Sequence, residues 1–139
     1  TELGDDSYKH YPFRYFQKTE FTAPFASGSA RYDAMVIIPC SSHTLASIAA
    51  GLADSLLLRS AYVTLKQRRP LVLAHRETPL TAIDLENMQA VTRSGGIIMP
   101  ASPSFYLQPQ TINDLADTVV GRALDLLGVR HHLPVRWNP

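Results

Sequence analysis

Three short apolar runs, each followed by a helix-like segment, constrain the fold of this chain more than any other feature. The runs are "AMVIIP" (34–39), "PLVLAH" (70–75) and "GIIMP" (96–100). Strands that are apolar throughout need cover on both faces, so these runs predict an α/β domain built on a parallel sheet. In such sheets the crossovers are right-handed, and ligands bind beyond the carboxyl ends of the strands. The loops that follow the strands are therefore where we expect a functional site.

The segments after the first two runs predict helices. Residues 44–67 are helical in pattern, with a break expected near Gly51 or Ser55. The next helix is expected to start with Thr78 as its N-cap and Pro79 at its first position.

The last helix has the clearest boundaries. Thr111 is its expected N-cap, Asp114 completes a capping box, and Gly128 is its expected stop.

We interpret residues 1–139 as one domain, with an irregular lead-in over 1–32 that has room for a short helix, and a tail over 129–139. The lead-in holds eight of the chain's twelve aromatic residues: Tyr8, Tyr11, Phe13, Tyr15, Phe16, Phe21, Phe25 and Tyr32. We expect these side chains to pack on the domain or on a partner.

Composition excludes several classes of protein. The net charge of +1 gives no general attraction to nucleic acid or to an anionic membrane. Cys40 is the single cysteine, which excludes an intrachain disulfide and a multi-cysteine zinc site and fits a cytoplasmic protein. No apolar run approaches the ~20 residues that span a bilayer. The histidines follow no metal-site pattern, so no metal is expected.

The first loop, "CSSHT", places hydroxyls at a helix start. Ser41, Ser42, His43 and Thr44 lie where free backbone N–H groups and the helix dipole favour an anion. Plain capping needs only one hydroxyl. The residues alone leave capping and contact with a phosphate or cofactor both open.

Two other regions carry candidate site residues. Arg76 and Glu77, after the second run, can hold a phosphate and move a proton, or form an ordinary exposed ion pair. Tyr106, in the loop after the third run, can donate its hydroxyl to a ligand or simply pack. Arg59 and Lys66 belong to a basic stretch that is either a solvated face or a site for a small anion.

Four blocks of sequence, in this order and spacing, resemble those of the UbiX-type flavin prenyltransferase family. They are "PCSSHTLASIAAGLADSLLLRSA", "LKQRRPLVLAHRETPL", "GGIIMPASPSFY" and "VVGRALDLLG". The resemblance implies a three-layer Rossmann-like or flavodoxin-like fold and assembly into a homododecamer. It also implies transfer of a dimethylallyl group from dimethylallyl phosphate to reduced FMN, without a metal. The product, prenylated FMN, would serve a partner decarboxylase.

The resemblance further implies roles for particular residues. Those that match the family's flavin site are Ser41, Ser42, His43, Thr44 and Arg76. Those that match its dimethylallyl phosphate pocket or lie near it are Arg59, Lys66, Glu77, Tyr106 and Arg122. Glu77 and Lys66 are expected to take part in catalysis.

The chain also departs from the family. His43 replaces a basic residue, and Leu107 and Gln108 replace the usual basic pair after "FY". The family's first strand and its glycine-serine loop have no match, so we expect the native protein to carry an upstream unit of roughly 50–60 residues. Two alternatives stay open, a flavin-dependent cysteine decarboxylase of the same superfamily and a non-catalytic flavin-binding subunit.

Overall fold

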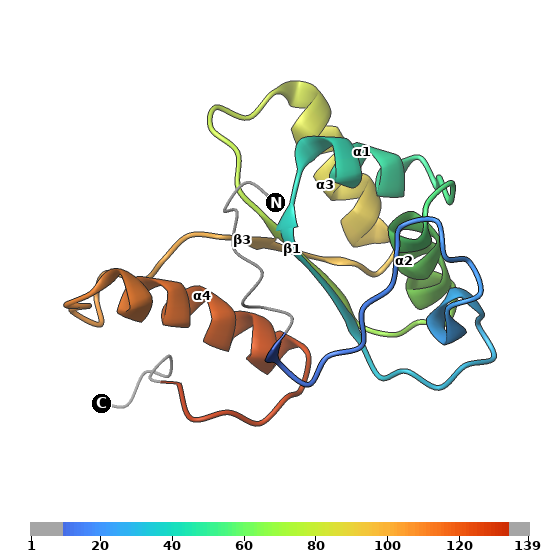
Figure 1. The fold of residues 1–139 in the computed structure, drawn as a ribbon. Coiled ribbons are helices and arrows are strands. Elements are labelled where there is room, and N and C mark those ends of the chain that lie inside the picture. Colours follow the sequence, from blue (N-terminus) through green and yellow to red (C-terminus); the bar gives the residue numbers. More distant parts are fainter. Residues whose placement is uncertain (1–9, 134–139) are drawn as a thin grey trace.

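A computed structural model describes residues 10–133 of the chain, drawn as a ribbon in Figure 1. Its centre is a three-stranded parallel sheet in the order β1-β2-β3. The strands are β1 (Met35–Cys40), β2 (Leu71–His75) and β3 (Ile97–Pro100). Each lies within one residue of the apolar run that predicted it, and the predicted α/β fold with a parallel sheet is confirmed.

Helices cover both faces of the sheet and make three layers (Figure 1). On one face lie α1 (Ser42–Ala49), α2 (Leu56–Lys66) and α3 (Ala82–Arg93), and on the other lies α4 (Ile112–Leu126). The expected break in the first helical segment is confirmed, because residues 50–55 separate α1 from α2.

The central strand explains why the layers hold together. All five residues of β2 are buried, and alternate side chains point to opposite faces of the sheet. Leu71 and Leu73 pack in the cluster with α1, α2 and α3, whereas Val72 and Ala74 pack against α4. Full burial of each leucine or valine side chain contributes about 1.5–3 kcal/mol. Within the described residues β1 is an edge strand, and Ile38 on it is 46% exposed.

The expected start of α3 at Thr78 is wrong by three residues. The N-cap is Thr81, whose side chain accepts from the N–H of Asp84 at 3.2 Å. The Asp84 carboxylate in turn accepts from the N–H of Thr81 at 2.9 Å. Thr81 has an acidic residue three positions on and Thr78 does not, so only Thr81 can form this reciprocal capping box.

The predicted capping box of α4 is confirmed and sets our first prediction. The side chain of Thr111 accepts from the N–H of Asp114 at 3.1 Å, and the Asp114 carboxylate accepts from Thr111 at 2.9 Å. Thr111→Ala should lower the free energy of unfolding by about 1 kcal/mol in urea titrations. The control is Thr92→Ala, a change of an exposed threonine in the last turn of α3, which should stay within about 0.5 kcal/mol of the parent. Equal effects of the two substitutions would contradict a capping role for Thr111.

The lead-in contains one short 3-10 helix, η2 (Pro24–Ala26), within its described part. Phe16 and Phe25 form an edge-to-face pair with ring centres 4.9 Å apart and pack on the cluster that includes Leu56 of α2. Several of the aromatic side chains thus pack on the domain itself. Residues 1–9, which include Tyr8, and the tail from 134 lie outside the described residues.

Candidate functional site

The three strands end at one edge of the sheet, and the loops after them gather there. A cavity of about 460 Å³ lies between the second and third loops. Its polar lining includes His75, Arg76 and Glu77 from the end of β2 and Ser102 from the loop after β3. The structure therefore brings two of the three predicted loops around one space.

The turn from β1 into α1 shows which hydroxyl caps the helix. Ser41 is the N-cap, and its Oγ accepts from the N–H of Thr44 at 3.2 Å and lies 3.0 Å from the Thr44 hydroxyl. Ser42 Oγ is buried and has no hydrogen-bond partner. His43 and Thr44 line a second cavity of about 430 Å³, whose other wall comes from the lead-in and from the start of α2. Capping explains Ser41 but not Ser42, so the turn retains polar groups for a ligand.

Arg76 and Glu77 stand exposed at the end of β2. The Glu77 carboxylate accepts from the N–H of Thr78 at 3.0 Å, which holds it beside the loop. Both side chains line the 460 Å³ cavity, where an arginine can hold an anion and a carboxylate can move a proton.

Tyr106 and Arg122 come together in a smaller cavity of about 240 Å³ between the third loop and α4. Thr118 ties these two parts together, because its hydroxyl accepts from the N–H of Ser104 at 3.1 Å. The two cavities adjoin, since Pro100 and Ser102 line both.

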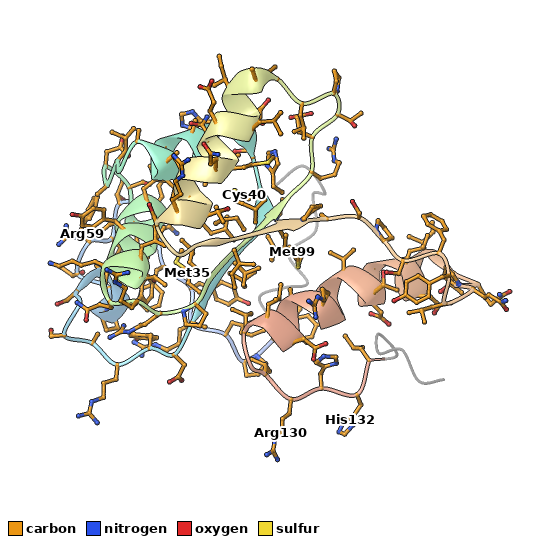
Figure 2. The ribbon with its side chains drawn as sticks, turned by 180° about the vertical axis from the view of Figure 1, so that it is seen from behind. Met35, Cys40, Arg59, Met99, Arg130 and His132 are labelled. Carbon is orange, nitrogen blue, oxygen red and sulfur yellow. The ribbon has the colours of Figure 1, made fainter. Side chains whose placement is uncertain are left out.

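Arg59 and Lys66 lie elsewhere in the chain. Lys66 is exposed at the end of α2, just before β2 begins, whereas Glu77 follows the end of β2. A five-residue strand spans roughly 15 Å, so these side chains are at opposite edges of the sheet. Arg59 donates from Nε to the carbonyl oxygen of Ala26 at 3.2 Å and lies far from Met99 of the Tyr106 cavity (Figure 2). Within a single chain, Lys66 therefore lies away from Glu77, Tyr106 and Arg122.

The structure also places three polar residues at this edge that the sequence analysis did not single out as site residues. His75 and Asp84 are buried, and the hydrogen bonds from Thr81 are the main reason that the pKa of Asp84 lies below its usual value. Burial raises the pKa of the Cys40 thiol to about 11, so Cys40 is a neutral thiol near pH 7 and not a nucleophile. The one sequence feature that could have pointed to His75 is its place at the end of a continuous apolar run.

The lowered pKa of Asp84 predicts an acid-sensitive α3. A group whose pKa is depressed on folding stabilises the fold above its unfolded pKa, and that contribution is lost as the pH falls through the folded value. The urea midpoint should therefore drop on acidification from pH 6 towards pH 3, and Asp84→Asn should show a smaller drop than the parent. Glu86→Gln, which removes an exposed carboxylate from the same helix, is the control and should follow the parent. Parallel curves for Asp84→Asn and the parent would contradict this role of Asp84.

Residues 10–133 contain no group of three or more His, Cys, Asp or Glu side chains that could hold a metal ion. Of the helices in this part of the chain, none is long and apolar enough to cross a membrane.

Taken together, the parallel sheet and the hydroxyl-rich turn at its carboxyl edge are features of α/β flavoproteins. Residues 5–124 match the protein-family model described as Flavoprotein. The chain is 48% identical over 122 residues to the flavin prenyltransferase UbiX of Thermoplasma acidophilum, a match that covers 88% of this chain. The chain belongs to the flavin prenyltransferase UbiX family, as its sequence blocks predicted.

Solved structures support the same relationship. The crystal structure of AnUbiX (PadA1) in complex with FMN and dimethylallyl pyrophosphate superposes with a TM-score of 0.85 at 48% identity over 88% of this chain. The dodecameric FMN-dependent UbiX-like decarboxylase from Escherichia coli O157:H7 gives a TM-score of 0.83 at 47% identity, also over 88%. The chain spans 68% of the Thermoplasma protein and 65% and 66% of these two chains, about two thirds of their length.

Proposed function

We propose that the protein carrying this chain is a flavin prenyltransferase. It joins the dimethylallyl group of dimethylallyl phosphate to reduced FMN and releases phosphate. The observation that carries this proposal is the 48% identity to a flavin prenyltransferase across 88% of the chain. A relative that holds both FMN and a dimethylallyl diphosphate in its crystal structure supports it.

The residues at the carboxyl edge fit a flavin. The first turn of α1 offers backbone N–H groups, and the buried Ser42 hydroxyl has no protein partner. Arg76 adds a cation that suits a phosphate or an electron-rich ring. Reduced FMN supplies the electron-rich ring atoms that accept the prenyl group. We therefore assign Ser41 to Thr44 and Arg76 to flavin binding.

Tyr106 and Arg122 are assigned to the departing phosphate. As the allylic C–O bond breaks, negative charge grows on the phosphate oxygens, and an arginine with a tyrosine hydroxyl stabilises it by charge-assisted hydrogen bonds. We assign to Glu77, beside Arg76, the uptake of the proton that the flavin loses when the new bond forms. Lys66 and Arg59 are the other two cationic residues that we assign to the phosphate.

One chain holds Lys66 and Arg59 away from the other residues, so we propose that a neighbouring copy supplies them in a homo-oligomer. Large apolar side chains are exposed on α3, on the third loop and at the start of α4: Ile83 is 68%, Phe105 70% and Ile112 83% exposed. Such side chains suit contacts between copies. The UbiX-like relative from E. coli is a dodecamer, and a dodecamer is the assembly that we propose here.

Three further expectations remain proposals. An upstream strand and helix would pair with the open edge of β1 and cover Ile38. The prenylated FMN would pass to a partner decarboxylase. The buried free thiol of Cys40 suits a reducing compartment, and we propose the cytoplasm.

The deciding experiment incubates the protein with reduced FMN and dimethylallyl phosphate under anaerobic conditions with EDTA present. Mass spectrometry of the extracted flavin should show FMN that carries one added five-carbon unit. Unmodified FMN in every reaction would overturn the proposal, and turnover only with added magnesium would overturn its metal-free form. Release of CO₂ from a cysteine substrate would instead support the decarboxylase alternative.

A further inference from the structure

His75 is a buried polar residue that the proposed chemistry does not use. It ends β2, is 3% exposed, and pairs in the sheet with Cys40 of β1 and Pro100 of β3. Its Nδ1 lies 2.8 Å from the carbonyl oxygen of Cys40, directly before the turn that we assign to flavin binding. Because a carbonyl oxygen only accepts, Nδ1 carries the proton and donates it. In the neutral ring Nε2 therefore has the lone pair.

The other ring nitrogen, Nε2, has no hydrogen-bond partner among the described residues. Nε2 of His75 and Oγ of Ser42 are the two buried side-chain polar atoms in residues 10–133 that make no hydrogen bond. Both residues lie near the carboxyl of Asp84, whose pKa is lowered mainly by the hydrogen bonds from Thr81 and further by the Ser42 hydroxyl. Ser42 nevertheless makes no direct hydrogen bond to that carboxylate. His75 and Ser42 thus lie beside Asp84.

These residues lie where three structural elements meet. Cys40 marks the place in Figure 2, at the end of β1 beside α1 and α3. Ser42 opens α1, His75 closes β2, and Asp84 belongs to the first turn of α3.

We propose that His75 is a positioning residue for the flavin-binding turn. Its Nδ1–H donates to the carbonyl of Cys40 and so holds the residue directly before that turn in place. The flavin-binding turn is thereby held at a set distance from Arg76, the residue after His75 and the other proposed flavin contact. This inference rests on the proposed function, because it concerns the same flavin site.

Two variants separate this role from simple core packing. His75→Asn retains a side-chain N–H close to the position of Nδ1 and can keep the bond to Cys40, whereas His75→Leu fills the space and removes both ring nitrogens. We expect His75→Leu to weaken FMN binding about tenfold or more, and His75→Asn to restore it to within about threefold of the parent. The measurement is quenching of FMN fluorescence on titration with protein. Circular dichroism of each variant without flavin confirms that it is folded.

A spectroscopic measurement tests the inference without mutation. In ¹⁵N NMR of the labelled protein, the His75 ring should show a protonated Nδ1 and an unprotonated Nε2. The opposite tautomer would overturn the inference, even if His75→Leu failed to fold. Equal FMN affinity of the parent and a folded His75→Leu would also overturn it and leave the proposed function intact. A parent protein that does not bind FMN would overturn both.

Discussion

Arg122→Ala is expected to slow the formation of prenylated FMN about a hundredfold or more, and Tyr106→Phe by a similar factor, because each removes a donor to the phosphate as it departs. The two residues line one cavity between the third loop and α4, so they act on the same group. The measurement is the initial rate of prenylated FMN formation with reduced FMN and dimethylallyl phosphate.

Matched controls make this result specific. Tyr11→Phe changes an exposed tyrosine in the lead-in, and Arg130→Ala changes an exposed arginine beyond the end of α4 (labelled in Figure 2). Neither residue belongs to the cavities at the carboxyl edge, so both variants should keep the parent rate. FMN affinity should change little in Tyr106→Phe and Arg122→Ala, because Arg76 and the flavin-binding turn are intact. Unchanged rates in both variants would contradict the assignment of Tyr106 and Arg122.

The strands of this fold were predictable because each is apolar along its whole length. The run at 70–75 predicted β2 to within one residue, and burial of all five strand residues explains why. The start of α3 was not predicted, since Thr78 with Pro79 is a general helix-start signal and the reciprocal bonds between Thr81 and Asp84 are specific. A full capping box is therefore the better guide to a helix start than a threonine before proline.

The sequence predicted candidate residues for the site but not how the fold arranges them. Sequence blocks pointed to the turn at 41–44 and to Arg76, and parallel strand order places both at one edge. The strand β2 lies between Lys66 and Glu77 in the chain, so these two residues are at opposite ends of the strand. Sequence similarity alone had grouped them in one pocket. The place of His75 at the end of an apolar run did not indicate its role, because its bond to the Cys40 carbonyl exists only when β1 and β2 pair.

The separation of Lys66 from Arg122 leads to the second large effect, restoration of activity in mixed oligomers. Lys66→Ala and Arg122→Ala should each lose most of the prenylation rate on their own. If a site combines Lys66 of one copy with Arg122 of another, a one-to-one mixture of the two variants regains about a quarter of the parent sites, because random assembly places both intact residues at that fraction. Co-expression of differently tagged chains, followed by purification through both tags, gives mixed oligomers for the rate measurement.

The decisive comparison is a second mixture, Tyr106→Phe with Arg122→Ala. These two residues line one cavity in the same chain, so every site in that mixture carries one of the two defects and the rate should stay low. Recovery in the first mixture but not in the second is the pattern expected when α2 of one copy faces the third loop and α4 of its neighbour. Failure of the first mixture to recover, in oligomers shown by light scattering to contain both chains, would mean that Lys66 and Arg122 do not serve a shared site between copies.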